Sequence, residues 1–322
     1  MTMIQSGQQG GPPDSGVMAT PRMMRATEVG RWSRFARAAT PYVYIAPFFI
    51  IFFAFFAYPV VYSLYVSLHS WTGQGAMKWV GLGNYSFVLS DNYFWLAIQT
   101  TIFIWLSVPI GLFIGMVVAV LWNRPRVRGR GVVLVLYLLP AVVSIVAISL
   151  VFKIMYDPTA GPIDVVLQSV GLQPIPWLSD EFWARICILL VRVWEIVGLA
   201  ALFFGASLQS ISQDYYDAAA VDGGGPIRQF FSITMPLLTR TILFLTIVNT
   251  LGALSLFAEP QLITSNGGPN NATTTLGLYL LLKVQGLDLG TASSVSFLMT
   301  VLMMIVSIVL FFAARRWMTN TA

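Results

Sequence analysis

The chain has 322 residues, of which 57% are hydrophobic and 10% are charged, and its mean hydropathy is +0.76. Soluble globular domains carry roughly 25% charged residues, so the composition excludes a soluble protein and indicates a polytopic membrane protein solvated by lipid. The net charge of +5 does not indicate nucleic-acid binding, because the basic residues cluster beside apolar runs. One cysteine, Cys187, and one histidine, His69, give little support to a disulfide framework, a metal site or a Ser-His-Asp triad.

Residues 1–40 are expected to form a flexible, basic tail ahead of a membrane domain that covers residues 41–322. The stretch GQQGGPPDSG has the composition of a disordered segment. No apolar segment follows the positive charges of the tail in the way that a secretory signal peptide requires. The stretch RWSRFAR fits either a segment that lies along the lipid headgroups or a charged flank for the first span.

Six apolar runs are long enough to cross a bilayer, and helices are expected because a lipid-exposed backbone must satisfy its own hydrogen bonds. They lie near residues 43–66, 95–122, 132–155, 184–208, 237–257 and 292–314. The predicted fold is therefore an all-α membrane protein with six transmembrane helices. Kinks are expected at four prolines in or near these spans: Pro47, Pro59, Pro109 and Pro140.

The distribution of Lys and Arg predicts that both termini are cytoplasmic, because cytoplasmic connections are enriched in these residues. Thirteen arginines fall in the termini and in the second and fourth connections: Arg22, Arg25, Arg31, Arg34, Arg37, Arg124, Arg126, Arg128, Arg130, Arg228, Arg240, Arg315 and Arg316. The opposite side carries only Lys78, Lys153 and Lys283. The fourth connection therefore faces the cytoplasm as well.

This fourth connection contains the unusual run YYDAAAVDGGG. Ser212 is a suitable N-cap and Asp214 suits the first turn of a helix, whereas the glycines at 223–225 end it. Pro226 then suits the start of a second helix that ends near Pro236. A short helix with a small-residue face can enter a groove on another protein, although an ordinary helical hairpin between two spans has the same pattern.

The segment from 217 to 236 resembles the "EAA" loop of ATP-binding-cassette importer permeases, in which a glutamate, two alanines, an acid–glycine pair and a final Ile-x-Leu-Pro recur. Six positions match this pattern: Ala218, Ala219, Asp222, Gly223, Ile233 and Pro236. Three differ, since Asp217 replaces the glutamate, Gly224 an alanine and Met235 the leucine.

In that family the loop forms a cytoplasmic coupling helix between the fourth and fifth transmembrane helices, docked on an ATPase subunit. The resemblance implies a coupling loop over 210–236 that acts through Tyr216, Asp217, Ala218, Ala219, Asp222, Gly223 and Pro236. It also implies a second, different permease subunit, two cytoplasmic ATPase subunits that bind ATP and Mg, and an extracytoplasmic binding protein, in a bacterial or archaeal cytoplasmic membrane. The chain has no P-loop, so we expect no bound cofactor, no metal and no catalytic residue.

Further stretches resemble the carbohydrate-importer branch of this family, and in particular the type related to the larger maltose-transporter permease. They are Ala46-Pro47 with Tyr58-Pro59, the run VGLGNY at 80–85, Phe152-Lys153 with Asp157, the run WLSD at 177–180 and the run TSNGGP at 264–269. The resemblance implies an oligosaccharide or monosaccharide substrate. A permease for glycerol-3-phosphate or a related polyol phosphate shares the outer signatures and remains an alternative.

Polar side chains at membrane depth are costly, so they are candidates for a functional role. Arg192 and Glu195 lie three residues apart on one helical face, where they can pair. The pair either neutralises itself and orients the helix, or lies on the translocation pathway and offers sugar hydroxyls a donor and an acceptor beside Trp194.

An ungapped match to the maltose-transporter subunit implies seven sugar-contacting positions: Ile145, Arg192, Ile196, Asn249, Gly252, Ala253 and Leu256. Several of these are apolar here, so the resemblance implies different contacts and a different sugar. Glu259 and the turn at 266–269 are expected to shape the mouth of the pathway or to meet the binding protein.

Two other classes of protein agree less well with the sequence. A secondary transporter often carries intramembrane acids and internal repeats, but Glu195 is the single deep acid expected here and no repeat is evident. A membrane-embedded enzyme needs a catalytic set at one depth, and this chain supplies none that we can assemble.

Overall fold

The computed structural model describes residues 31–123 and 130–319. The expectations about the tail at 1–30 and about the arginines at 124–129 therefore lie outside the described residues. The chain divides into two units at Pro59. The described part of the first unit is the helix α1 (Arg31–Phe52), a π-helical turn η1 (Phe53–Ala57) and the first two residues of α2 (Tyr58–Ser67).

The second unit is almost entirely helical among the residues that the structure describes. After the rest of α2 its elements are β1 (His69–Ser70), β2 (Lys78–Trp79), α3 (Gly83–Ser90), α4 (Asn92–Trp105), α5 (Ser107–Trp122), α6 (Arg130–Val142), α7 (Ile145–Met155), α8 (Pro162–Ser169), α9 (Glu181–Gln209), α10 (Gln213–Val221), α11 (Pro226–Gln229), the π-helical turn η2 (Phe230–Thr234), α12 (Met235–Leu254), α13 (Ala258–Leu262), the 3-10 turn η3 (Pro269–Asn271), α14 (Leu276–Gln285) and α15 (Leu289–Thr319). The two strands form one short antiparallel pair, with His69 opposite Trp79.

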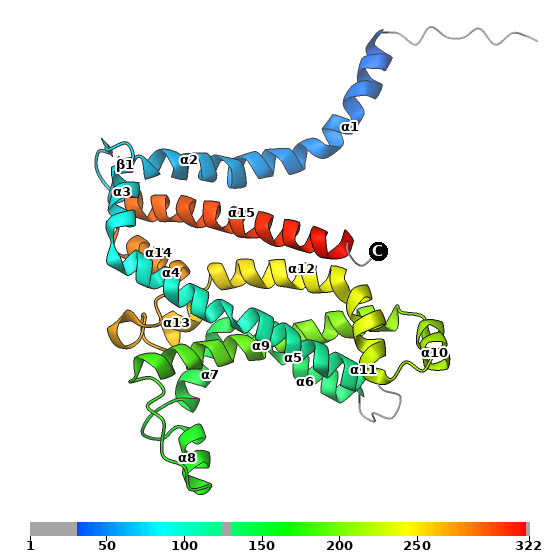
Figure 1. Cartoon of the computed structure of the whole chain (residues 1–322). Helices are drawn as coiled ribbons and strands as arrows, with labels where there is room; N and C mark the ends of the chain where they lie inside the picture. The colour runs from blue at the N-terminus through cyan, green and yellow to red at the C-terminus, as the bar shows by residue number, and fades with distance from the viewer. Residues whose placement is uncertain (1–30, 124–129, 320–322) are drawn as a thin grey trace, which may run out of the picture. The chain divides into compact units, whose positions relative to one another are not determined.

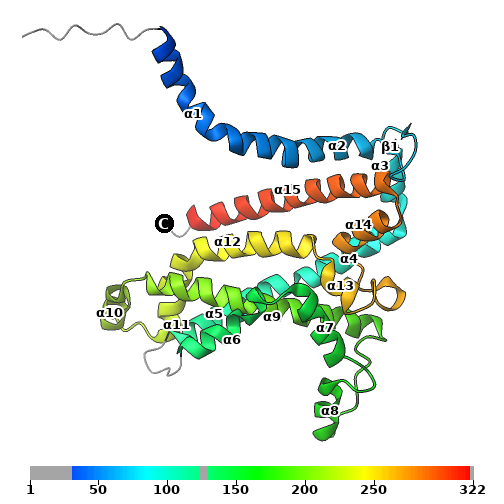
Figure 2. The ribbon, with the colours of Figure 1, turned by 180° about the vertical axis from the view of Figure 1, so that it is seen from behind.

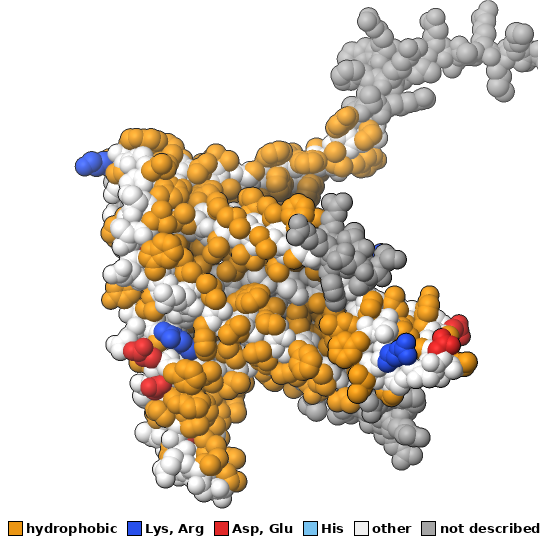
Figure 3. All heavy atoms as spheres, in the orientation of Figure 1, with side chains coloured by type: hydrophobic (Ala, Val, Ile, Leu, Met, Phe, Trp, Pro, Cys, Tyr) orange, Lys and Arg blue, Asp and Glu red, His pale blue; other side chains and the backbone are white. Residues whose placement is uncertain are grey.

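The helices of the second unit form a bundle with two distinct ends. Figures 1 and 2 show α3, α8, α13 and α14 at one end of the bundle and α10 and α11 at the other. Figure 3 shows hydrophobic side chains along the flank and the visible charged side chains at the two ends. This distribution suits a bundle whose flank is solvated by lipid and whose ends reach water.

Five helical stretches of the described chain are long and apolar enough to cross a membrane. They are Thr40–Ser67, Asn92–Trp122, Glu181–Gln209, Pro226–Leu262 and Leu289–Ala313. The run predicted at 132–155 is not one continuous helix, because α6 ends at Val142 and α7 begins at Ile145. Ser144 between them has an extended ψ of 134°. Hydropathy reports that the run is apolar, but it does not report this break in the backbone.

Local sequence explains where several of the helices begin. The carboxylate of Asp91 accepts a hydrogen bond from the amide of Tyr93 at 2.9 Å and caps α4. Asp180 caps α9 in the same way through the amides of Phe182 and Trp183. Each cap satisfies backbone donors that the first turn of a helix leaves unpaired.

Prolines shape the spans as expected, with one correction. Each of the two π-helical turns ends two residues before a proline, η1 before Pro59 and η2 before Pro236. A wide turn accommodates a residue that has no N–H to donate. The prediction that the second helix of the fourth connection ends near Pro236 is wrong, because the chain stays helical through η2 into α12.

Small residues allow three helices to pack closely at the centre of the bundle. A Cβ built on Gly111 would lie 2.8 Å from Ile196, and one built on Gly115 would lie 2.6 Å from Ala200, so α5 and α9 approach through a Gly-xxx-Gly face. On α9 itself, a Cβ on Gly198 would lie 1.7 Å from the carbonyl oxygen of Tyr137 in α6. The central helix α9 therefore packs closely against α5 at the glycines of α5, and against α6 at its own Gly198.

Candidate functional site

The first candidate site is α10, the short helix predicted from the run YYDAAAVDGGG. The Ser212 hydroxyl accepts a hydrogen bond from the amide of Asp214 at 3.3 Å, which confirms the predicted cap. Asp217, Ala218 and the following Asp222 are exposed. The helix therefore presents its small residues and acids outward at one end of the bundle (Figure 1).

The glycines after α10 have a specific conformational role. Gly223 has a φ of +73°, a region that glycine adopts without strain. The amide of Gly224 donates to the carbonyl of Ala219 at 2.8 Å, and a Cβ on Gly224 would lie only 2.7 Å from that oxygen. The glycine found at 224, where the resembling pattern has alanine, fits this tight turn.

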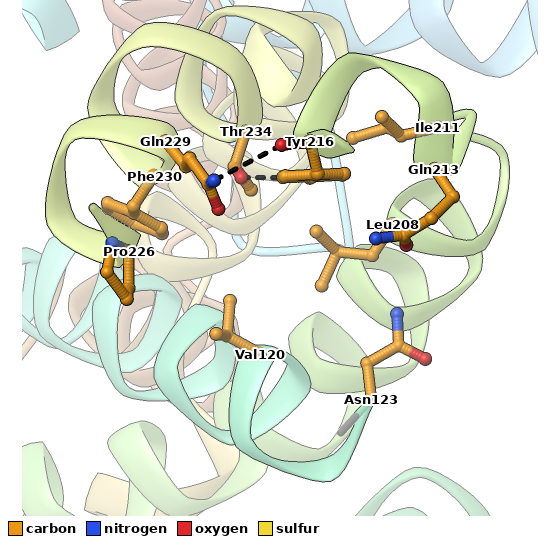
Figure 4. Close-up of a pocket in the computed structure, with 10 residues that line it drawn as sticks. All are labelled: Val120, Asn123, Leu208, Ile211, Gln213, Tyr216, Pro226, Gln229, Phe230 and Thr234. Atoms are coloured by element: carbon orange, nitrogen blue, oxygen red, sulfur yellow. Dashed lines mark hydrogen bonds between the residues drawn. The ribbon is translucent and has the colours of Figure 1, made fainter. Parts of the chain in front are cut away.

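Three polar side chains attach α10 to the helix that follows it (Figure 4). The Tyr216 hydroxyl lies 3.0 Å from the hydroxyl of Thr234. The Gln229 amide donates to the carbonyl of Tyr216 at 3.2 Å and to that of Gly224 at 3.0 Å. Sequence reasoning missed Gln229 and Thr234, although polar residues within an otherwise apolar stretch before Pro236 are a signal that could have found them.

A cavity of about 330 Å³ opens beneath this attachment. Its lining comes from the ends of α5 and α9 and from the segment that joins α10 to α12, as Val120, Asn123, Leu208, Ile211, Gln213, Tyr216, Pro226, Gln229, Phe230 and Thr234 (Figure 4). The side of α10 that faces the bundle is thus loosely packed, whereas its hydrogen bonds to the next helix are specific. Tyr216 and Gln229 thus couple α10 to the segment that leads into α12 by hydrogen bonds, in addition to its short backbone link to α9.

The second candidate site is a cluster of charged side chains in the interior of the bundle. The Arg192 Nη1 lies 2.5 Å from Glu195 Oε2, which confirms that the two residues pair, and 3.4 Å from Glu259 Oε1. Glu259 was expected at the mouth of the pathway, but it lies in α13 with 2% of its surface exposed and contacts Arg192. The cluster therefore holds one guanidinium and two carboxylates.

Three further residues expected on the pathway, in α9 and α12, have contacts of different kinds. A Cβ on Gly252 in α12 would lie 3.6 Å from Arg192 Nη2, so α12 passes close to the guanidinium. The ring of Trp194 is 41% exposed and meets the ring of Phe152 at 5.4 Å. One turn before Gly252, the half-buried Asn249 donates its amide to the carbonyl of Leu245 at 2.8 Å.

The other positions expected on the pathway have different surroundings. Ile196, Ala253 and Leu256 are buried in hydrophobic clusters, with at most 5% of their surface exposed. Ile145 is half-buried at the first turn of α7. The structure thus brings Arg192, Glu195 and Gly252 together with Glu259, and it places Ile196, Ala253 and Leu256 in the packing between helices.

The segment TSNGGP forms a tight loop at the end of the bundle opposite α10. Ser265, Asn266, Gly267 and Gly268 all have positive φ values. The Thr264 hydroxyl lies 2.6 Å from that of Thr273, and Lys153 donates to the Ser265 hydroxyl at 3.1 Å. Within residues 31–123 and 130–319, no group of three His, Cys, Asp or Glu side chains is placed to hold a metal ion.

Comparison with known proteins identifies relatives over most of the chain. The chain is 36% identical over 281 residues to the lactose transport system permease protein LacF of Rhizobium radiobacter, which covers 85% of this chain and 93% of that protein. It is 32% identical over 278 residues to the trehalose/maltose transport system permease protein MalF of Thermococcus litoralis, covering 86% and 94%.

The fold is also shared with a solved structure. A chain of the bacterial alginate ABC transporter, crystallised with an alginate-pentasaccharide-bound periplasmic protein, aligns with a TM-score of 0.76 and 22% identity, covering 89% of this chain and 98% of that one. Residues 107–320 match the family described as the inner membrane component of binding-protein-dependent transport systems. This protein therefore belongs to that family of inner membrane components.

Proposed function

We propose that this chain is one permease subunit of an ATP-driven sugar importer and that α10 is the helix through which ATPase subunits move it. The relatives named for lactose and for trehalose and maltose support a sugar substrate, and they align with 85% and 86% of the chain. A second, different permease subunit completes the pathway. An extracytoplasmic binding protein delivers the sugar, and two cytoplasmic ATPase subunits bind ATP and Mg.

In this proposal the membrane domain covers residues 41–322, follows a cytoplasmic tail at 1–40 and crosses the inner membrane six times. The third crossing is the broken pair α6 and α7, which together span the run from Arg130 to Met155. Both termini and α10 are cytoplasmic, as the distribution of arginines predicts. The sugar passes the face of α9 and α12 that carries Arg192, Glu195 and Asn249.

The observation that carries the proposal is the direct helical connection between the two candidate sites. From Pro226 to Leu254 the chain forms one helical stretch without a break, through α11, η2 and α12. Its first turns are hydrogen-bonded to α10 through Gln229 and Thr234, and its later turns pass Arg192 at Gly252. A displacement of α10 by a bound ATPase would therefore move the helix that borders the charge cluster.

The proposal is tested by Ala218→Arg in the complex reconstituted with its binding protein. Ala218 is exposed within α10, so arginine leaves the fold of this chain intact and obstructs a closely docked partner. We expect sugar-stimulated ATPase activity to fall at least about tenfold, as a loss of roughly 1.4 kcal/mol or more in docking would produce. Gly223→Asp is a less specific variant, because a side chain at a φ of +73° also strains the turn.

The matched control is Ala160→Arg, which adds the same side chain to an exposed alanine next to α8 at the opposite end of the bundle. It should leave stimulation by the sugar unchanged. Co-purification of the subunits checks assembly for both variants. Transport that proceeds without ATPase activity and ignores Ala218→Arg would contradict the proposal and favour a secondary transporter.

A polyol-phosphate importer is the second candidate function, and the charge cluster disfavours it. A phosphate would need a cationic side chain that is free to pair with it, whereas Arg192 is already engaged by Glu195 and Glu259. Stimulation of the ATPase by glycerol 3-phosphate would support this candidate.

A further inference from the structure

We propose that the cluster of Arg192, Glu195 and Glu259 forms an electronegative filter on the sugar pathway, which admits uncharged or cationic sugars and opposes anionic ones. The inference rests on the proposed function and deepens it by naming the charge class of the substrate. It starts from a charge count, since one guanidinium meets two carboxylates and the ionised cluster carries a net charge of −1.

No other charged group within the described residues neutralises this excess by direct pairing. On α7, Lys153 is exposed and donates to the Ser265 hydroxyl. On α9, Arg185 donates to the carbonyl of Ala272, two turns outside Arg192, or about 10 Å at the rise of an α-helix. Both cations point to the outer loop, so the carboxylates face α12 without a second cation.

The cluster also has unused hydrogen-bonding capacity. Buried Arg192 Nε and Glu195 Oε1 have no hydrogen-bond partner among the described residues. A buried donor or acceptor without a partner costs about 1–3 kcal/mol. Sugar hydroxyls can satisfy both atoms, because a hydroxyl both donates and accepts.

An anionic group meets the excess negative charge at this position. The Arg192 Nε–H is free to donate to it, but Nη1 already serves both carboxylates, so a phosphate, sulfate or carboxylate bound to the guanidinium lies beside two like charges. Like charges at short range in a site shielded from water repel strongly. An ammonium group would instead pair with Glu195 Oε1 or with Glu259, so an amino sugar is accepted.

The sign of the local potential can be measured with a thiol reporter in the reconstituted complex. Ser255 is exposed just after α12, three residues from Gly252 and four from Glu259. In a Cys187→Ala background, Ser255→Cys is labelled with a cationic trimethylammonium-ethyl and an anionic sulfonatoethyl methanethiosulfonate. The rate with the cationic reagent is divided by the rate with the anionic reagent. This ratio is then divided by the same ratio for a free thiol in the same buffer.

We expect a normalised ratio above one, which falls roughly fivefold in Glu259→Gln, as one unit charge at close range gives even in a water-like dielectric. Glu195→Gln serves as the second variant, and Arg192→Gln should raise the ratio. Glu181→Gln is the control, because Glu181 bonds to Asn270 and lies eleven residues before Arg192. This is about 16 Å along α9, beyond the screening length of about 8 Å.

A ratio below one, or a ratio that neither Glu259→Gln nor Glu195→Gln lowers, would overturn the inference. The second arm measures ATPase stimulation by lactose, glucosamine, glucuronate and glycerol 3-phosphate in the same complex. Stimulation by lactose or glucosamine supports the filter, whereas stimulation by glucuronate or glycerol 3-phosphate overturns it. Because labelling needs neither ATP nor substrate, it decides the inference even where the proposed function fails.

Discussion

Glu259 lies 67 residues from Arg192 along the chain, yet its carboxylate reaches the same guanidinium nitrogen as that of Glu195. Burying two acids with one base is expensive, because each charge loses its hydration. A soluble core would gain stability from apolar residues of the same size at these positions. Retaining the three charges is therefore easier to understand as a feature of the pathway than as a source of stability.

A second polar site is predicted to make stability depend on pH. Burial alone would raise the pKa of Asp91. The hydrogen bonds from the Tyr279 hydroxyl at 2.7 Å and from the amide of Tyr93, together with Lys283 at 3.6 Å, hold that pKa below its usual value. A carboxylate with a lowered pKa in the folded state contributes stability above its unfolded pKa, and the contribution is lost as the pH falls through the folded value.

We therefore expect Asp91→Asn to lower the unfolding temperature at pH 6, and this difference from the wild type to shrink as the pH falls below about 4. Thermal unfolding in detergent at several pH values measures the difference. Tyr279→Phe removes one hydrogen bond only, so it should show a smaller effect with the same direction. A difference that grows towards low pH would contradict the assignment.

The sequence indicated some of these side chains and missed others, for a physical reason. Arg192 and Glu195 are three apart in one helix, so their pairing follows from helical geometry alone. Glu259 joins them only because the chain turns after α12 and α13 brings its carboxylate to within 3.4 Å of Arg192, and no periodicity reports such a contact. Gln229 was missed for the same reason, since its partners Tyr216 and Gly224 lie across the turn between two helices.

At the scale of the elements, the packing of α9 depends on glycines where neighbours come close. We expect Gly198→Ala to be strongly destabilising, by about 3 kcal/mol or more. The added methyl group would meet the carbonyl oxygen of Tyr137 in α6, and overpacking of even ordinary cores costs 1–3 kcal/mol. The unfolding temperature in detergent measures the effect.

The control for this prediction is Gly225→Ala. A Cβ at Gly225 meets no heavy atom within 4 Å, and its φ of −70° suits any residue. We expect a change within about 0.5 kcal/mol. Equal unfolding temperatures for the two variants would show that α6 moves away from α9 without cost.

The element boundaries show how far hydropathy and capping rules reach. The rules placed α10 correctly, because Ser212 and the glycines at 223–225 are local signals. They predicted a kink at Pro140 but not the break at Val143 and Ser144, three residues further along, which separates α6 from α7. They also failed at Pro236, because the wide turn before it lets the helix continue. Apolar composition predicts that a segment lies in the membrane more readily than it predicts the path of its backbone.

At the scale of the whole molecule, the single cysteine offers a reporter of global unfolding. Cys187 is fully buried in a cluster with Ile104 of α4, Ile148 of α7 and Ile263 beyond α13. These residues come from distant parts of the second unit, so exposure of the thiol requires the bundle to open. We expect N-ethylmaleimide to label the native protein slowly and to label it rapidly at the temperature where helical circular dichroism is lost.

The control for this measurement is Ser255→Cys in the Cys187→Ala background, whose thiol is exposed in the folded protein. It should react with the maleimide well below the unfolding temperature. Rapid labelling of Cys187 in the native state would show that the end of the bundle near α7 and α13 opens independently of the rest.

The wide turn at Phe230–Thr234 has a consequence for how related chains are aligned. A π-helical turn holds one residue more than an α-helical turn of the same reach, so every side chain after it is rotated by about 100° relative to a regular helix. A relative with an unbroken α-helix here is one residue shorter over the same span. Comparing the residues that border the pathway in two such chains therefore requires a gap inside 230–234, because an ungapped alignment assigns the residues of one face to another.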